Sequence, residues 1–302
     1  MLANVKKKYN FNLGMRRKRF IGQSILSIIL FALAGTMILP FVYVIMVSFT
    51  DASVYEAGKF MLWPKKWSLQ AYQFILKGNG FLNAMKATAF ITLVGTPLSI
   101  IMNAGLGYML SKKTLPGRNV INKLVMVTML FGAGMIPAYI NMSNLNLLNS
   151  WFACILPNAC GALTVMVMKS FFQSLPDELE EAAKIDGCGA LKTFWLIVIP
   201  LSKAMLATFT LFGAVSYWNT YFSAVMYITK SSMQPLQIFL QKIVLSSNYS
   251  DVLDVSSALA KDLPQEVIKM ATVVIAVLPI MLVYPFLQKY FAKGVMIGSV
   301  KG

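Results

Sequence analysis

Six long apolar runs alternate with polar segments along the chain. A bilayer core about 30 Å thick requires roughly 20 consecutive apolar residues in a helix, and six runs meet or approach that length. They lie at 23–49, 87–110, 122–143, 151–172, 203–228 and 266–288. Nearly all charged side chains lie outside these runs. The pattern therefore predicts an all-α polytopic membrane protein with six transmembrane helices.

The first run also has features of a secretory signal. A basic stretch precedes it, and Ala32-Leu33-Ala34 is similar to a cleavage site. The apolar character continues to Val47, well beyond that triplet. We therefore interpret this run as an uncleaved span.

The distribution of Lys and Arg predicts the orientation of the spans. If the N-terminus is inside, 18 of the 27 basic residues lie in the cytoplasmic segments or beside them. Positive residues concentrate on the cytoplasmic side of membrane proteins. We expect both termini in the cytoplasm.

Overall composition agrees with a membrane protein and argues against a nucleic-acid-binding one. Apolar residues make up 57% of the chain and charged residues 13%, against about 25% charged in a soluble protein. The net charge of +16 is explained by basic residues beside the spans, which are attracted to anionic headgroups. No segment is long enough to form a basic soluble domain that would bind nucleic acid.

The residue inventory excludes most enzyme chemistry. The chain has no His, and its three Cys form no CxxC pair, so neither a His-based triad nor a zinc site is indicated. We expect a protein that is not an enzyme and that binds no cofactor or metal itself. Residues 23–49, 87–110, 204–229 and 270–288 contain no Asp, Glu, Lys or Arg, which argues against proton coupling. The absence of these charges does not argue as strongly against sodium coupling, because sodium can bind carbonyl oxygens at broken helices. An ion-coupled secondary transporter is therefore kept as an alternative function.

Two outer segments and one segment within a span carry aromatic or amphipathic patterns. Residues 62–76 contain Trp63 and Trp67 as interface anchors and Ser68 as a helix cap. Residues 233–245 have apolar positions at helical spacing and would pack on lipid or on a partner protein. The WNTYF segment at 218–222 is compatible with an outer aromatic belt or with a polar pathway for sugar-like solutes.

The segment between the fourth and fifth runs has the strongest local signals. Pro176 suits the first turn of a helix, and Ser174 with Asp177 is similar to a capping box. Gly187 is a natural residue to end that helix, and a second short helix is expected from Gly189 toward Pro200. We expect two short helices separated by a break.

Five of the eleven acidic residues lie in this cytoplasmic segment of a basic protein, which predicts a partner protein. Glu180 and Lys184 have the spacing of an ion pair within the helix. Ala182 and Ala183 leave one side small enough for the close approach of another surface.

The same segment resembles the EAA loop of ABC importer permeases. That pattern is EAA, three residues, Gly, nine residues, then I-x-L-P, and it is matched by EAAKIDG at 181–187 and IVIP at 197–200, with Ile199 in place of Leu. The six spans, the WNTYF segment and the ending FAKGVMIGSVKG at 291–302 are similar to the MalG-like subunit of carbohydrate importers. Residues 108–119 and 128–140 resemble the LplC and YtcP branch, which is linked to complex oligosaccharides.

The resemblance implies a type I ABC importer fold and a division of the chain into segments. These are a basic cytoplasmic N-terminus at 1–22, an extra span at 23–49, an extracytoplasmic loop at 50–86, a five-span permease core at 87–290 that includes the EAA loop at 173–203, and a cytoplasmic tail at 291–302. It also implies location in the bacterial cytoplasmic membrane.

The function implied is that of a permease subunit forming half of a carbohydrate pathway, with a non-sugar solute as the alternative. Its partners would be a second homologous permease, two cytoplasmic ATPases that bind ATP and Mg²⁺, and an extracellular solute-binding protein. The helix at 175–187 would dock in an ATPase groove, and the tail near 298–302 would also reach the ATPases. The expected docking residues are Glu181, Ala182, Ala183, Asp186 and Gly187. The expected pathway residues are Trp218, Asn219 and Tyr221.

Overall fold

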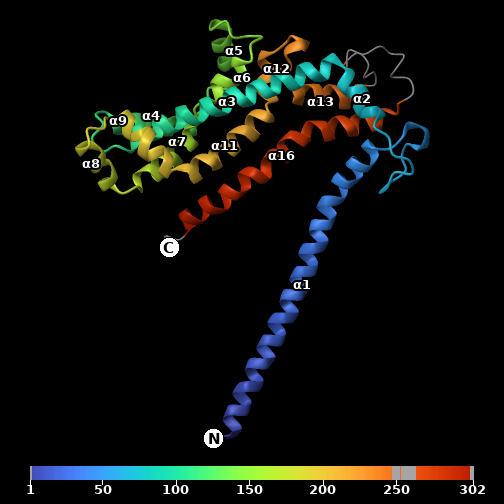
Figure 1. Ribbon diagram of the computed structural model, residues 1–302, viewed down its shortest axis with the longest axis horizontal. Coiled ribbons are helices and arrows are strands. Elements are labelled where there is room, and N and C mark those ends of the chain that lie inside the picture. The colour runs from blue at the N-terminus through green and yellow to red at the C-terminus, as the bar shows by residue number, and fades with distance from the viewer. Residues whose placement is uncertain (1, 247–251, 253–262, 300–302) are drawn as a thin grey trace. The chain divides into compact units, whose positions relative to one another are not determined.

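The computed structural model describes residues 2–246, 252 and 263–299, and the side chains of 22–283 and 285 within those ranges (Figure 1). The chain divides into two compact units, Met1–Tyr72 with Asp262–Val274, and Gln73–Lys261 with Ile275–Gly302. The described residues are helical, apart from connecting segments and an isolated bridge between Thr50 and Trp67. The expected ATPase contact of the tail rests on residues 300–302 and on neighbouring side chains that lie outside the described part.

Six membrane spans are compatible with the helices that the structure describes. Three helices are long and apolar enough to cross a bilayer, namely Gly22–Ser48, Asn79–Ser111 and Gln265–Val283. Three bent helix pairs bring the number to six if each pair is one span. The all-helical class expected from the apolar runs is confirmed.

In the first unit, the helix α1 (Leu2–Ser48) continues through the first apolar run and ends in a compact turn. Beyond it lie the short helix η1 (Ala52–Val54) and the first residues, 70–72, of α2 (Gln70–Lys77), whose remainder belongs to the second unit. The Ser68 hydroxyl accepts a hydrogen bond from the Gln70 backbone N–H at 3.2 Å, as expected for a cap at the start of α2. The Trp63 and Trp67 rings meet edge to face with their centroids 5.5 Å apart.

The Asp51 carboxylate holds the turn after α1 together. Its Oδ1 accepts hydrogen bonds from the hydroxyl and the backbone N–H of Ser53, at 2.6 and 3.0 Å. Its Oδ2 forms an ion pair with the Lys66 ammonium at 3.0 Å. The Ser53 hydrogen bonds and the Lys66 charge favour the ionised form and lower the pKa of Asp51 to about 2.

This shifted pKa predicts a pH dependence of stability. A carboxyl whose pKa is lower in the folded chain stabilises it above its ordinary pKa near 4 and loses that contribution as the pH falls toward about 2. We therefore expect the melting temperature of the purified protein to fall more steeply between about pH 5 and pH 2.5 than that of Asp51→Asn. Parallel melting curves for the two proteins over this range would contradict the assignment.

The second span is longer than expected and forms the centre of the second unit. Helix α3 (Asn79–Ser111) begins eight residues before the predicted start, so the end of the predicted outer loop is helical. It packs along α7 (Ala162–Gln173) and α11 (Lys203–Trp218) (Figure 1). Two glycines permit these close approaches. A Cβ on Gly95 would lie 2.9 Å from the Tyr217 ring, and one on Gly107 would lie 3.2 Å from backbone atoms of α7.

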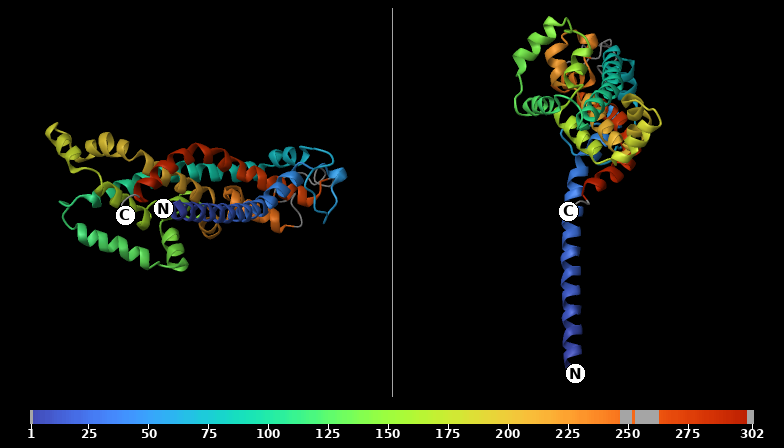
Figure 2. Two further views of the ribbon diagram at one scale, coloured as in Figure 1. Left: turned by 90° about the horizontal axis from the view of Figure 1, so that it is seen from below. Right: turned by 90° about the vertical axis from the view of Figure 1, so that its left-hand side faces the viewer.

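The third and fourth predicted spans are broken helices. The third consists of α4 (Arg118–Leu130) and α5 (Met135–Asn144), which meet at 118° around Gly132 and Gly134. Helix α4 buries none of its residues in this chain, and Figure 2 shows it at the edge of the group of helices. It contacts α3 and α7, and the Lys169 ammonium of α7 donates a hydrogen bond to the Asn122 Oδ1 of α4 at 2.8 Å.

The fourth consists of α6 (Phe152–Ile155) with the short helix η2 (Leu156–Asn158), followed by α7 at 48°. The break lies at Gly161, the N-cap residue of α7. Glycine weakens a helix because its backbone loses more conformational freedom there than that of other residues, and proline interrupts it because it lacks the backbone N–H.

The fifth predicted span, 203–228, is wrong as one continuous helix. Helix α11 ends at Trp218, and α12 (Phe222–Tyr227) is a separate helix. The segment that forms a bent pair with α11 precedes it, at 84°, and consists of α9 (Ala190–Thr193), the π-helical η3 (Phe194–Val198) and α10 (Ile199–Leu201). The apolar run concealed this break because Asn219, Thr220 and Ser223 are the only Asn, Thr or Ser residues that it contains after Ser216.

The outer amphipathic segment packs on its own chain. After the short turn η4 (Ser231–Met233), helix α13 (Leu236–Leu245) places Leu236, Phe239 and Ile243 of the predicted apolar face in the protein interior. Its neighbour is α3, where the Thr88 hydroxyl accepts a hydrogen bond from the Leu236 backbone N–H at 2.7 Å. This face is therefore covered by the chain itself and not by lipid or a partner.

Candidate functional site

The acidic segment forms a short exposed helix at the end of α7. Helix α8 (Asp177–Ile185) follows Pro176, which adopts an extended backbone conformation as the N-cap residue. The predicted capping box is wrong, because the Ser174 hydroxyl donates a hydrogen bond to the Phe171 carbonyl at 2.7 Å and so closes α7 instead. The acids in its first turn remain favourably placed at the positive end of the helix.

The end of α8 depends on Gly187, as the sequence predicted. Gly187 has φ of 75°, a left-handed conformation that side chains with a Cβ disfavour. Its N–H donates to the Lys184 carbonyl at 3.0 Å, and the Cys188 N–H donates to the Ala183 carbonyl at 2.8 Å. These two bonds form a Schellman motif, which satisfies the last carbonyls of the helix and turns the chain sharply.

The expected docking residues do not all face outward. Glu181, Ala182, Asp186 and Gly187 are exposed, whereas Ala183 is only 3% exposed and lies against the chain itself. The helix also exposes Ile185 by 87%, an apolar residue that the sequence reasoning did not select. The sequence offered one indication of its role, namely that Ile185 is an isoleucine within a segment of charged residues. An exposed apolar side chain in such a place is typical of a contact with a partner.

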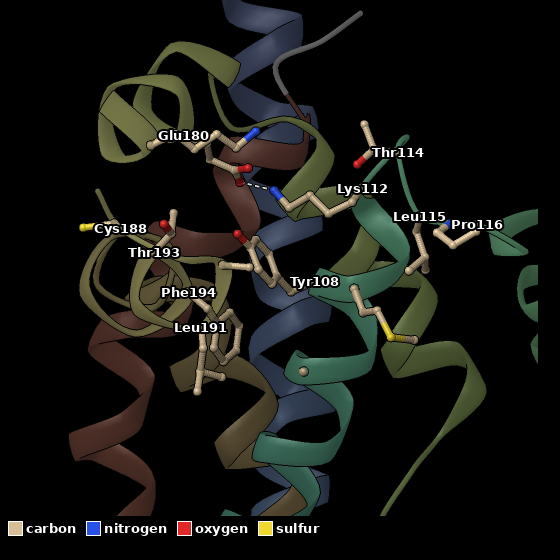
Figure 3. A pocket seen from close by; sticks show the side chains of 14 residues that line it. Tyr108, Lys112, Thr114, Leu115, Pro116, Glu180, Cys188, Leu191, Thr193 and Phe194 are labelled. Atoms are coloured by element: carbon tan, nitrogen blue, oxygen red, sulfur yellow. Dashed lines mark hydrogen bonds and ion pairs between the residues drawn. The ribbon is translucent and has the colours of Figure 1, made fainter. Parts of the chain in front are cut away.

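The Glu180 carboxylate pairs with Lys112 at the end of α3, instead of with Lys184 on its own helix as the spacing predicted (Figure 3). The Lys112 ammonium also lies 4.1 Å from the centroid of the Tyr108 ring, a cation–π distance. The Tyr108 ring in turn contacts the Phe194 ring of η3 with centroids 5.0 Å apart. The sequence reasoning missed these contacts, because Lys112 and Glu180 are 68 residues apart.

A cavity of about 590 Å³ lies between the end of α3 and the acidic segment. Its lining includes the Lys112–Glu180 pair and apolar side chains from both elements (Figure 3). The apolar and small residues that line it include Tyr108, Leu115, Cys188, Leu191 and Phe194. Among the described residues, no group of three or more Cys, Asp and Glu is placed to hold a metal ion.

The WNTYF segment forms the break between α11 and α12. The Trp218 Nε1–H donates to the Ala276 carbonyl at 3.3 Å, which anchors this ring within the protein. Asn219 is exposed, and its Oδ1 accepts a hydrogen bond from the Gln237 side chain of α13 at 3.0 Å. Tyr221 is 37% exposed. Of the three expected pathway residues, Asn219 and Tyr221 therefore offer polar groups at the surface, while Trp218 is engaged in packing.

A buried amide on α3 holds the break in the fourth span. Asn103 is 1% exposed, and its Oδ1 accepts a hydrogen bond from the Gly161 backbone N–H at 2.9 Å. Its Nδ2 donates to the Ala159 carbonyl at 3.0 Å. Asn103 thus satisfies backbone groups that the broken helix leaves without partners, a requirement that is strict at membrane depth.

Comparison with known proteins supports a transport role. Residues 114–297 match the family described as binding-protein-dependent transport system inner membrane component. The chain is 43% identical to the polygalacturonan/rhamnogalacturonan transport system permease protein YtcP of Bacillus subtilis (strain 168), over 88% of this chain and 93% of that protein. It is 44% identical to protein LplC of the same organism, over 88% of this chain and 90% of that protein.

A solved structure agrees with the sequence relatives. A chain of a bacterial ABC transporter involved in the import of the acidic polysaccharide alginate matches this fold with a TM-score of 0.83 and 33% identity. The match covers 90% of this chain and 96% of that chain. Together with the family match, the membrane helices and the exposed acidic helix, these findings show that the chain belongs to the binding-protein-dependent transport system inner membrane components, the permeases of ABC importers.

Proposed function

We propose that this chain is one of two permease subunits of an ATP-driven importer and that its solute is a carbohydrate delivered by an extracellular solute-binding protein. The observation that carries the proposal is helix α8, an exposed acidic helix with a sharp Schellman end at Gly187. Such a helix presents charge and an apolar tip at a fixed angle, which suits a groove in a second protein. The named relatives support a sugar as the solute.

In this proposal, α8 docks in a groove of a cytoplasmic ATPase. The exposed side of α8 carries Glu181, Ala182, Asp186 and Gly187, and Ile185 adds an apolar contact at its end. Glu181 pairs with a basic residue of the ATPase, while Ala182 permits close approach. An external source of energy agrees with the sequence, because residues 23–49 and 87–110 hold no Asp, Glu, Lys or Arg that would carry a driving proton.

The remaining partners and the orientation follow from the same assignment. Two ATPases hold ATP and Mg²⁺, and a second homologous permease completes the pathway in the bacterial cytoplasmic membrane. Both termini and α8 lie in the cytoplasm, in agreement with the distribution of basic residues. The apolar side chains that α4 exposes suit the bilayer or that second subunit.

Asn219 and Tyr221 are the proposed solute contacts. The exposed Asn219 amide, which is hydrogen-bonded to the Gln237 amide, offers donor and acceptor groups that can bind sugar hydroxyls. The Tyr221 ring offers an apolar face with a polar end. Trp218 acts less directly, because its indole N–H is already bonded within the protein.

Replacing Glu181 with alanine tests the docking role. One hydrogen bond to a charged group contributes about 1.5–3 kcal/mol, so we expect the ATPase to bind about tenfold more weakly or worse. The measurements are ATPase co-purification and solute uptake into proteoliposomes with the complete importer. The matched control is Glu178→Ala, one turn earlier on the same helix and outside the docking set.

Glu181→Ala is expected to be inserted in normal amount but to import at least about tenfold less solute. Normal uptake by the double variant Glu181→Ala with Gly187→Asp would contradict docking through α8. Uptake by the unchanged protein that persists without ATP and collapses with an ion gradient would instead identify a secondary transporter.

A further inference from the structure

We propose that the Lys112–Glu180 ion pair, supported by Tyr108, is a latch that transmits movement of α8 to the end of α3. The inference rests on the proposed function, because it assumes that α8 moves with a docked ATPase. It assigns a role to residues outside the docking surface, at the inner side of the same segment (Figure 3). Lys112 and Glu180 are thus positioning residues.

The attraction between Lys112 and Glu180 is screened less by water than that of an ordinary surface ion pair. The side chains of Lys112 and Glu180 are only 31% and 19% exposed. Water therefore screens their attraction less than it does between fully exposed charges. The Tyr108 ring, 4.1 Å from the Lys112 ammonium, adds a second attraction that holds this cation in place.

Helix α8 has little other contact with the interior of the chain. Within α8, every residue of which the structure describes, only Ala183 is buried. A cavity of about 590 Å³ adjoins the pair, so the space between α8 and α3 is not filled by packed side chains. The ion pair is therefore a specific connection between α8 and the end of α3, and the Tyr108 hydroxyl of α3 also interacts with the Glu180 carboxylate.

Lys112, the end of the latch on the α3 side, is connected to closely packed helices that can transmit its movement. Lys112 directly follows α3, and α3 packs closely on both α7 and α11. At Gly107, one turn before the latch, α3 approaches the backbone of α7 so closely that a Cβ would lie 3.2 Å from it. Tightly packed helices move together, so displacement of Lys112 is expected to move the central part of the unit.

The latch can also open without leaving a carboxylate unpaired. Lys184 lies four residues after Glu180 on α8 and lines the same cavity. If the Glu180 carboxylate separates from Lys112, it can therefore pair with the Lys184 ammonium, which lies four residues later on the same helix. Two alternative partners for one carboxylate make the contact a two-state element, which a transmission step requires.

Lys112→Ala tests the latch in the complete importer, with Lys113→Ala as the matched control because Lys113 is the adjacent, exposed lysine. The measured quantity is solute imported per ATP hydrolysed in proteoliposomes. We expect this ratio to fall about tenfold in Lys112→Ala and Glu180→Ala, the effect of losing one charge-assisted bond. Lys113→Ala is expected to keep the ratio of the unchanged protein.

Variants that restore the charge pair distinguish a role in transmission from a role in folding alone. Lys112→Arg, and the exchange of Lys112→Glu with Glu180→Lys, are expected to restore at least about half of the lost coupling. Unchanged coupling in both alanine variants would overturn the proposal, and so would failure of both rescues. Co-purification distinguishes the two proposals: Lys112→Ala is expected to retain the ATPase, whereas loss of docking through Glu181 removes it.

Discussion

Replacing Gly107 with valine is expected to prevent stable packing of α3 against α7 and to lower the yield of folded protein sharply. A Cβ at this position would lie 3.2 Å from the Lys169 backbone nitrogen, the Val165 carbonyl oxygen and the Met168 Cβ. Backbone atoms cannot move aside as a flexible side chain does, so the helices must separate. Overpacking of this kind costs about 1–3 kcal/mol, and valine adds two further methyl groups beyond the Cβ.

Gly105→Val is the matched control, because it places the same residue on the same helix two positions away. A Cβ on Gly105 meets no atom within 4 Å. Both changes alter helix propensity equally, so only the contact with α7 differs. The measurement is thermal unfolding of the detergent-purified protein together with the yield of monodisperse material. Equal melting temperatures for the two variants would refute the close approach.

Asn103→Leu is expected to destabilise the break in the fourth span and to reduce solute uptake. Leucine has a similar size, but it leaves the Gly161 N–H and the Ala159 carbonyl without the hydrogen bonds that Asn103 makes at 2.9 and 3.0 Å. Each buried group left unsatisfied costs about 1–3 kcal/mol, so the two together cost about 2–6 kcal/mol. Water cannot replace these bonds within the hydrocarbon region.

The exposed residue Asn141 on α5 offers a control for this change, because Asn141→Leu removes an amide without orphaning a buried backbone group. The measurements are the melting temperature in detergent and uptake by the reconstituted importer. We expect a loss of stability for Asn103→Leu alone. Equal stability of both variants would show that the break at Gly161 is held by other contacts.

Local sequence rules predicted those features that depend on neighbouring residues. Three of the six apolar runs correspond to helices that are long enough to cross a bilayer by themselves, because the length and apolarity of a run determine whether a helix can span it. The end of α8 at Gly187 was also correct, because a left-handed residue at the end of a helix requires glycine. The EAA pattern then indicated the family that the comparisons showed.

Several local predictions were wrong because the residue concerned makes a different contact from the one that its neighbours in the sequence suggested. Ser174 closes α7 instead of capping α8, because Pro176 is the N-cap residue of α8. The run at 203–228 contains a break that hydropathy does not register, because Asn219 turns toward Gln237 on α13. Glu180 pairs with Lys112 in preference to the lysine on its own helix.

The sequence by itself determined that the chain is a helical membrane protein and where the acidic helix ends. Each of these depends on residues within a few positions of one another. The tertiary structure alone decided that Lys112 meets Glu180, that Asn103 holds the break at Gly161, and that Gly107 permits the approach of α7. Such pairings join residues some 60 positions apart, and they arise only when helix packing brings specific faces together.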